Sequence, residues 1–182
     1  MKKTILVFAA IVMIVGFTTK TMAQVTLTGN TAGATLVKVL TITNVTPLNF
    51  GVIGITSGTA GTVVMGTDGT RTPGASTTTI VNTGTQKTVA EFDLTGTTDA
   101  VYTISIPSPI VVSTAGGGAN KTMNINTLKV KVDAAAEADA SGATGTLTSG
   151  ASVFLLSGKL NIGSAQVLGV YAGTYDVTVD YQ

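Results

Sequence analysis

The sequence contains no cysteine, no histidine and no tryptophan among its 182 residues. Without cysteine the chain has neither a disulfide nor a thiolate nucleophile, and without histidine it lacks the usual proton shuttle of enzymes. The missing tryptophan removes the best aromatic platform for stacking on sugars. These absences argue against an enzyme and predict no catalytic residue, no bound metal and no cofactor.

Positive charge is also scarce, and much of it lies at the N-terminus. Lys2 and Lys3 precede an apolar run from Ile5 to Phe17, which is shorter than the roughly 20 residues of a membrane-spanning helix. This pattern is typical of a secretory signal peptide, and we expect residues 1–23 to be removed after Ala23. An uncleaved signal anchor is the alternative. The sequence therefore predicts an exported protein that meets the membrane only during export.

The part that follows Ala23 is weakly acidic. It holds seven basic and nine acidic residues, which gives a formal net charge of 7 − 9 = −2. Nucleic-acid binding requires clustered positive charge, so we expect no nucleic acid as a partner.

The remaining composition favours strands, because threonine, valine and isoleucine are abundant and turn residues recur at short intervals. We expect one all-β domain with the architecture of an antiparallel β-sandwich. The predicted strands are Ala34–Thr43, Leu48–Ile53, Gly61–Met65, Thr77–Val81, Thr88–Leu94, Val101–Ile106, Met123–Val132, Val153–Ile162 and Gly173–Tyr181.

Alternation of apolar and polar residues supports several of these strands. Val101–Ile106 places Tyr102, Ile104 and Ile106 on one face, as expected for a strand with one side in the core. The stretch Asp133–Ala140 is alanine-rich but only eight residues long, so a turn or a loop is as compatible with it as a helix.

One glycine cluster resembles a phosphate-binding loop. Gly116–Gly118 comes shortly before Lys121 and Thr122. The residue before the lysine is Asn120 and not glycine, and the residues that follow have a strand pattern instead of a helical one. We interpret this stretch as a loop without a phosphate site.

Two groups of acidic residues are candidate sites. Glu91 and Asp93 stand two apart on a predicted strand and share a face, as a glycosidase pair or a calcium site requires. Asp133, Glu137 and Asp139 form a second group. Neither group has the ligand spacing of a calcium-binding loop, and solvated strands and loops commonly carry such residues, so we assign neither a catalytic nor a metal-binding role.

The last fourteen residues, Gly169 to Gln182, contain the most regular strand pattern. Apolar side chains alternate with polar ones along this stretch: Tyr175, Val177, Val179 and Tyr181 alternate with Thr174, Asp176, Thr178 and Asp180.

This C-terminal pattern resembles that of chaperone-usher pilus subunits, which have a penultimate tyrosine and a glycine fourteen residues from the end. Here these positions are Tyr181 and Gly169. The resemblance extends to the layout of spore coat U-like domains and of the bacterial domain of unknown function 4402, over roughly residues 34–182. Its other motifs are Leu48-Asn49-Phe50-Gly51, Gly61 to Val64, Tyr102 to Ile106, Leu128 to Val132, Val153 to Ile162 and Ala172 to Tyr175. The chain departs from the pilins in having no disulfide.

The resemblance implies an immunoglobulin-like sandwich that lacks its last strand and is completed by a donor strand from another subunit. In that case the C-terminal strand, with Gly169, Tyr175, Val177, Val179 and Tyr181, binds a neighbouring subunit or a chaperone. The implied partners are further copies of the chain, a periplasmic chaperone and an outer-membrane usher. The implied product is a pilus-like filament at the cell surface.

The N-terminal extension, residues 24–33, is the candidate donor strand, and the sandwich domain is then residues 34–182. If the donor extends to residue 42, its apolar residues are Val25, Leu27, Leu36, Leu40 and Ile42. Alternatively, residues 34–43 are the first strand of the domain itself. The rival function is a monomeric secreted binding module, similar to an adhesin, that recognises a surface glycan or protein through Tyr102, Tyr171 and Tyr175.

Overall fold

The computed structural model describes residues 26, 28–29, 31–56, 58–74, 78–80, 87–116 and 118–182. The chain divides into two units, residues 1–35 and Leu36–Gln182. The predicted signal peptide and four residues of the predicted extension, Val25 and Leu27 among them, lie outside the described residues.

The second unit is built from antiparallel strands, and the described residues contain no helix. The prediction of an all-β sandwich is confirmed. The strands are β1 (Thr41–Thr46), β2 (Ile53–Ile55), β3 (Gly61–Met65), β4 (Arg71–Pro73), β5 (Thr78–Ile80), β6 (Ala90–Thr95), β7 (Val101–Ser105), β8 (Ile110–Ser113), β9 (Thr122–Val132), β10 (Ala138–Asp139), β11 (Ala143–Thr146), β12 (Ala151–Ile162) and β13 (Thr178–Tyr181).

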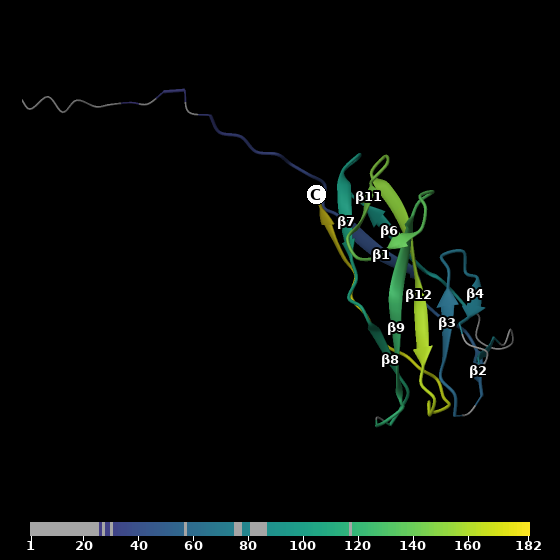
Figure 1. Ribbon diagram of the computed structural model, residues 1–182. Helices are drawn as coiled ribbons and strands as arrows, with labels where there is room; N and C mark the ends of the chain where they lie inside the picture. Colours follow the sequence, from purple (N-terminus) through teal and green to yellow (C-terminus); the bar gives the residue numbers. More distant parts are fainter. Residues whose placement is uncertain are drawn as a thin grey trace, which may run out of the picture. The chain divides into compact units, whose positions relative to one another are not determined.

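The larger sheet is organised around β12 (Figure 1). One edge of β12 pairs with β9 along most of its length, with a register shift between Ser157 and Lys159. The other edge pairs first with β6 and then with β3. We call the end of the sandwich at Ala151 the closed end and the end at Ile162 the open end.

A smaller sheet, in the order β11-β7-β13, faces the larger one at the closed end. The core between them contains Phe92 and Phe154, whose rings stack with centroids 4.8 Å apart, and the buried residues Tyr102 and Ile104. The Tyr102 hydroxyl lies 2.7 Å from Ser152 Oγ, which donates to a carboxylate oxygen of Asp133. The alternation predicted for Val101–Ile106 is therefore confirmed.

Three predicted strands differ from the observed ones. Only the last three residues of the predicted strand 34–43 lie in β1, and strand structure near residue 50 starts at Ile53 instead of Leu48. The predicted strand 173–181 is paired only from Thr178 onward. Its partner β7 ends at Ser105 and is followed by Ile106 and Pro107, and proline has no N–H to extend the ladder.

Several strands were missed by the sequence analysis: β4, β8, β10 and β11. The alanine-rich stretch 133–140 consists of a turn followed by the whole of the two-residue strand β10, and it contains no helix. Residues 122–132 form a strand, in agreement with the rejection of a phosphate-binding loop.

Candidate functional site: an apolar cavity beside a free strand edge

The C-terminal strand lies at the edge of the smaller sheet. β13 pairs with β7 from Thr178 opposite Ser105 to Tyr181 opposite Tyr102. Within the described part of the chain no strand pairs with the other edge of β13. A strand edge of this kind presents unpaired backbone N–H and C=O groups and is a template for a further strand.

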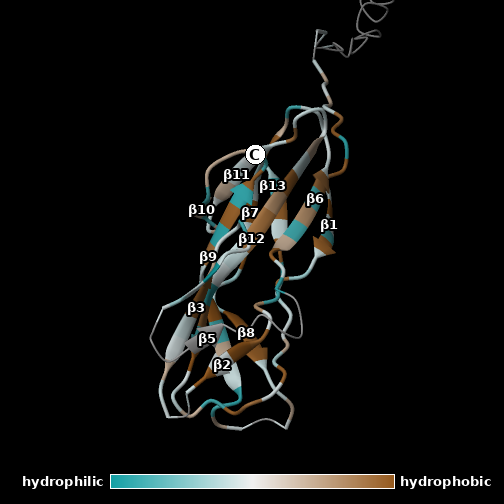
Figure 2. Cartoon of the chain, turned by 90° about the vertical axis from the view of Figure 1, so that its right-hand side faces the viewer, coloured by the Kyte–Doolittle hydropathy of each residue, from teal (hydrophilic) through white to brown (hydrophobic). Residues whose placement is uncertain are grey.

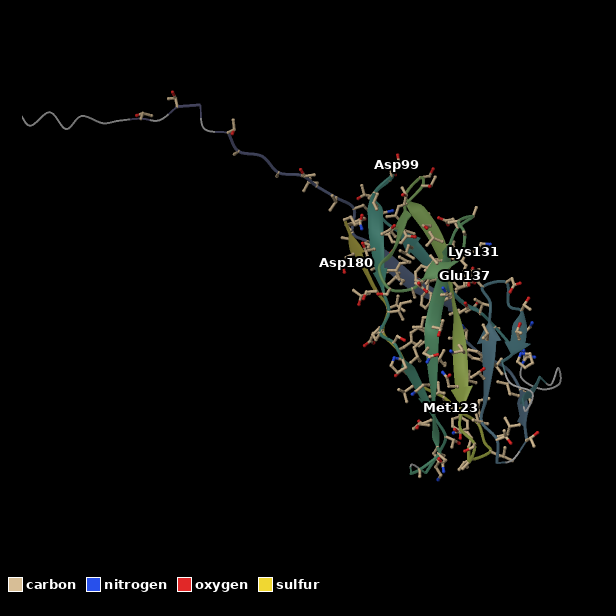
Figure 3. The ribbon with its side chains drawn as sticks, viewed as in Figure 1. Asp99, Met123, Lys131, Glu137 and Asp180 are labelled. Carbon is tan, nitrogen blue, oxygen red and sulfur yellow. The ribbon has the colours of Figure 1, made fainter. Side chains whose placement is uncertain are left out.

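The predicted alternation of the C-terminal residues is confirmed. All four apolar residues, Tyr175, Val177, Val179 and Tyr181, are partly buried and pack against the core. The intervening residues Thr174, Asp176, Thr178 and Asp180 are exposed. Asp180 is labelled in Figure 3 on this strand. The strand therefore has one face on the core while one of its edges carries no neighbouring strand.

An apolar cavity of about 500 Å³ lies at the open end. Its walls are the chain segments 48–55 and 166–175, and its floor comes from β8, β9 and β12. The apolar side chains of the lining are Leu48, Phe50, Val52, Ile53, Ile55, Ile110, Val112, Met123, Ile125, Leu160, Ile162, Val167, Leu168, Val170 and Tyr175. Figure 2 shows β2, β5 and β8 grouped at this end, away from the C-terminus. Well-packed interiors contain few voids larger than a water molecule, so a cavity of this size marks missing packing.

One wall of the cavity is held by an arginine. The Arg71 guanidinium donates hydrogen bonds to the carbonyl of Phe50 at 2.7 Å and to that of Val52 at 3.2 Å. Asn49 exchanges two backbone hydrogen bonds with Thr88, of 2.9 and 2.8 Å. The wall is therefore fixed in place although a cavity lies beside it.

The opposite wall crosses β8 at close range. Ala172 and Ser113 exchange backbone hydrogen bonds of 2.8 and 2.9 Å. A Cβ atom on the neighbouring Gly173 would clash with the carbonyl oxygen of Val111. Glycine is needed here because the two backbones approach more closely than a side chain permits.

Tyr175 connects this wall to the C-terminal strand. Its ring lines the cavity, and burial raises the pKa of the Tyr175 hydroxyl above its ordinary value. Desolvation is the cause, because the apolar surroundings disfavour the phenolate. The raised pKa of Tyr175 therefore reflects how strongly its hydroxyl is shielded from water.

The penultimate tyrosine has a different environment at the closed end. The Thr97 N–H donates to Tyr181 Oη at 2.8 Å, and Tyr181 Oη donates to the Lys38 carbonyl at 2.8 Å. The Lys38 N–H donates to Thr97 Oγ1, also at 2.8 Å. Together these bonds fix Lys38, just before β1, against the C-terminal strand.

The structure divides the candidate donor residues into three groups. Val25 and Leu27 lie outside the described residues. Leu36 is 95% exposed, whereas Leu40 packs against the core and Ile42 lies in β1 opposite Leu94 of β6.

The second acidic group, Asp133, Glu137 and Asp139, has structural partners. Asp133 accepts hydrogen bonds from Ser152 Oγ and from the Val153 N–H, and Asp139 forms an ion pair of 2.7 Å with Lys129. Glu137 Oε2 accepts from the Thr67 N–H and hydroxyl. In the part of the chain that the structure describes, no three residues of the histidine, cysteine, aspartate and glutamate types are grouped so as to hold a metal ion.

The described ranges contain no helix that is long and apolar enough to cross a membrane.

Comparison with protein families identifies the domain. The model of the family "Domain of unknown function (DUF4402)" matches residues 40–181, which includes the strands from β1 to β13 and both walls of the cavity. The chain belongs to the DUF4402 family. No curated protein and no solved structure matches this DUF4402 chain. The predicted likeness to this family is therefore confirmed.

Sequence patterns did not predict the cavity of this DUF4402 domain or the position of Arg71 beside it, and in the segment 166–173 they indicated only Gly169, which lies in the cavity lining and not in β13. Only one signal pointed there, namely the glycines at 169 and 173 on either side of an apolar stretch. A cavity depends on which strands become neighbours, and local patterns do not specify that.

Proposed function

We propose that the chain is a structural subunit of an extracellular filament, similar to a pilus, and that it polymerises by β-strand donation. The observation that carries this proposal is the 500 Å³ apolar cavity at the open end, whose lining includes Tyr175, three residues before the β13 strand with its free edge. An extended segment bound there would pair with backbone groups of the C-terminal strand and fill the cavity with alternate side chains. The chain has no catalytic role in this proposal.

The energetics favour occupation of the cavity. Burying three or four apolar side chains contributes about 5 to 12 kcal/mol at roughly 1.5 to 3 kcal/mol each. A whole domain has a net stability of about 5 to 15 kcal/mol. A subunit with an empty cavity is therefore prone to aggregate, and a filled one is much more stable.

The N-terminal arm of a second copy is the proposed occupant. Ile42 pairs within its own domain and Leu40 packs on its own core, so neither is available without disrupting β1. The donor segment therefore lies before residue 40, with Val25, Leu27 and Leu36 as candidate anchors. Because Lys38 is held at the closed end and the cavity is at the open end, donation from copy to copy produces an open head-to-tail chain.

Export and assembly factors complete the proposal. A signal peptide at residues 1–23 would direct the chain out of the cell. A periplasmic chaperone would cover the cavity and the edge of β13 before assembly, and an outer-membrane usher would exchange it for the next subunit. These partners are inferred from the resemblance to pilins.

The rival function, a monomeric binding module, has less support. Tyr102 is fully buried, and the Tyr171 hydroxyl is engaged with Val167 and Gln166. Two of the three aromatic residues that such a module would present are therefore committed within the fold.

Deletion of residues 24–33 with the signal peptide retained tests the proposal. We expect export to continue and filaments to disappear in negative-stain electron microscopy of the cells. The matched control pair is Val25→Asn with Leu27→Asn against Thr26→Asn with Thr28→Asn, because only the first pair removes apolar anchors. Filaments of normal length from the deletion variant would refute the donor assignment.

A further inference from the structure

Exposed apolar side chains in the second unit fall into two groups. Among the described residues, five large apolar side chains are more than 60% exposed. They are Leu36 (95%), Val37 (62%), Val39 (76%), Leu168 (81%) and Val170 (87%). Exposed apolar residues scattered singly are normal, but groups of them mark contact surfaces.

The two groups lie at opposite ends of the sandwich. Leu36, Val37 and Val39 flank Lys38, which is bonded to Thr97 at the closed end. Leu168 and Val170 line the cavity at the open end. Figure 3 labels Asp99, two residues from the Thr97 that binds Lys38, and Met123, in the cavity lining, at opposite ends of the sandwich. β12 runs from one end to the other and spans about 40 Å at 3.3 Å per residue.

The second group is held outward by an ordered loop. The Val167 N–H and the Gln166 side-chain amide both donate to the Asn120 carbonyl, at 3.0 and 2.8 Å. A Cβ atom on Gly169 would lie 2.7 Å from Thr114 Oγ1, so glycine allows the loop to lie close to the end of β8. The residues on either side of Gly169, Leu168 and Val170, remain exposed. A surface that is already ordered loses little conformational entropy when it binds.

We propose that Leu168 and Val170 of one copy contact Leu36, Val37 and Val39 of the next copy, as a second apolar contact beside the donated strand. This inference rests on the proposed function. In a head-to-tail chain each junction joins the closed end of one copy to the open end of another. The donated arm leaves the cavity of the next copy at its opening. The residues that come directly after the arm in the sequence are Leu36, Val37 and Val39.

The two surfaces also fit each other chemically. Both groups are aliphatic. Leu168 and Val170 lie in the cavity lining, and Leu36, Val37 and Val39 come directly after the residues proposed to be donated. The two groups differ from one another, so the contact is heterologous and does not close a dimer. The additional contact would stiffen the filament at each junction.

Engineered disulfides test this contact directly, because the natural chain has no cysteine. One cysteine replaces Leu36, Val37 or Val39 and a second replaces Leu168 or Val170, in full-length protein assembled into filaments and oxidised. A disulfide requires Cα atoms within about 7 Å. We expect at least one of these pairs, with V37C/L168C as the first to examine, to give a covalent ladder on a denaturing gel without reductant. The ladder should collapse to monomer when reductant is added.

The control pair is V37C/V64C, because Val64 lies on β3 away from both groups and is 42% exposed. It should give no ladder from filaments of the same length. If filaments are seen by microscopy but no pair gives a ladder, the second contact is refuted while strand donation stands. If wild-type protein forms no filaments at all, both proposals fail.

Discussion

The closed and open ends of the sandwich are built from the same kinds of residues but reach different packing. At the closed end Phe92, Phe154 and Tyr102 fill the space between two sheets and are at most 5% exposed. At the open end a comparable set of aliphatic residues surrounds a cavity of about 500 Å³. At the closed end the smaller sheet packs on the larger one, whereas at the open end the segments 48–55 and 166–175 leave a cavity between apolar side chains.

The same difference explains the polar features of the two ends. At the closed end hydrogen bonds of Tyr181 join strands that already pack together. At the open end Arg71 and Gln166 hold walls that face an unfilled space. Such preorganisation lowers the cost of binding an extended segment, because the site does not need to be rebuilt.

Truncation of a core aromatic side chain should cause the largest loss in the free energy of unfolding. It should also show most clearly how the packing of the closed end differs from that of the open end. Phe154→Ala removes a fully buried ring that stacks on Phe92, and we expect a loss of about 3 to 5 kcal/mol in the free energy of unfolding. Ile53→Ala, at the edge of the cavity, should cost only about 1 kcal/mol, since one side of the residue has few packing partners. Urea unfolding of monomeric protein measures both. Equal losses would show that the ends are equally packed.

Removal of the guanidinium that holds the cavity wall should have the next largest effect. Arg71→Met keeps much of the side-chain stem but removes the hydrogen bonds to Phe50 and Val52, and we expect a loss of about 2 kcal/mol. Lys121→Met is the control, because its ammonium makes one long bond of 3.4 Å to the Ala115 carbonyl. Amide exchange near residues 50–52 should accelerate in the first variant alone. Unchanged exchange there would contradict the role given to Arg71.

Loss of the penultimate hydroxyl should have a smaller effect at the closed end. Tyr181→Phe keeps the ring on the core but removes the acceptor for the Thr97 N–H and the donor to the Lys38 carbonyl. We expect a loss of about 1 kcal/mol and faster amide exchange at Thr97 and Lys38. Tyr171→Phe, whose hydroxyl bonds to Val167 at the open end, should leave exchange at these two positions unchanged. Equal exchange in both variants would show that Tyr181 does not fix this part of the chain.

The smallest expected effect is a dependence of stability on alkaline pH. Burial raises the pKa of Tyr175 in the folded chain, so the unfolded chain releases this proton first as the pH increases. The contribution is fully present below the ordinary tyrosine pKa of about 10 and is lost as the pH rises through the raised folded value. Urea titrations between pH 8 and about 11.5 should show a shallower decline for Tyr175→Phe than for wild type. Parallel curves would show that the Tyr175 hydroxyl is not desolvated.

Sequence patterns predicted the strands that pair on both edges or that pack one face on a filled core. The central strands β7, β9 and β12 show clear alternation, and the predictions for them agree with the structure within two residues. At the open end β2, β4 and β8 are only three or four residues long, which is too short for periodicity to identify.

The regular pattern before β13 shows why such predictions failed near the cavity. Residues 174–177 alternate as a strand does, but within the described residues they have no neighbour with which to form a ladder. Residues 34–39 likewise have a strand composition, but among the described residues no strand pairs with them. A sequence pattern shows only that a segment favours the strand conformation. Whether that segment pairs depends on whether another strand lies beside it.

The long strand β12 has a mechanical consequence. Because its hydrogen bonds to β9, β6 and β3 run across the direction from the closed to the open end, a force along that direction loads many of them at once in shear. Rupture then requires breaking these bonds together, and not one after another as in peeling. A domain built in this way resists pulling by its ends far better than its thermodynamic stability alone would suggest.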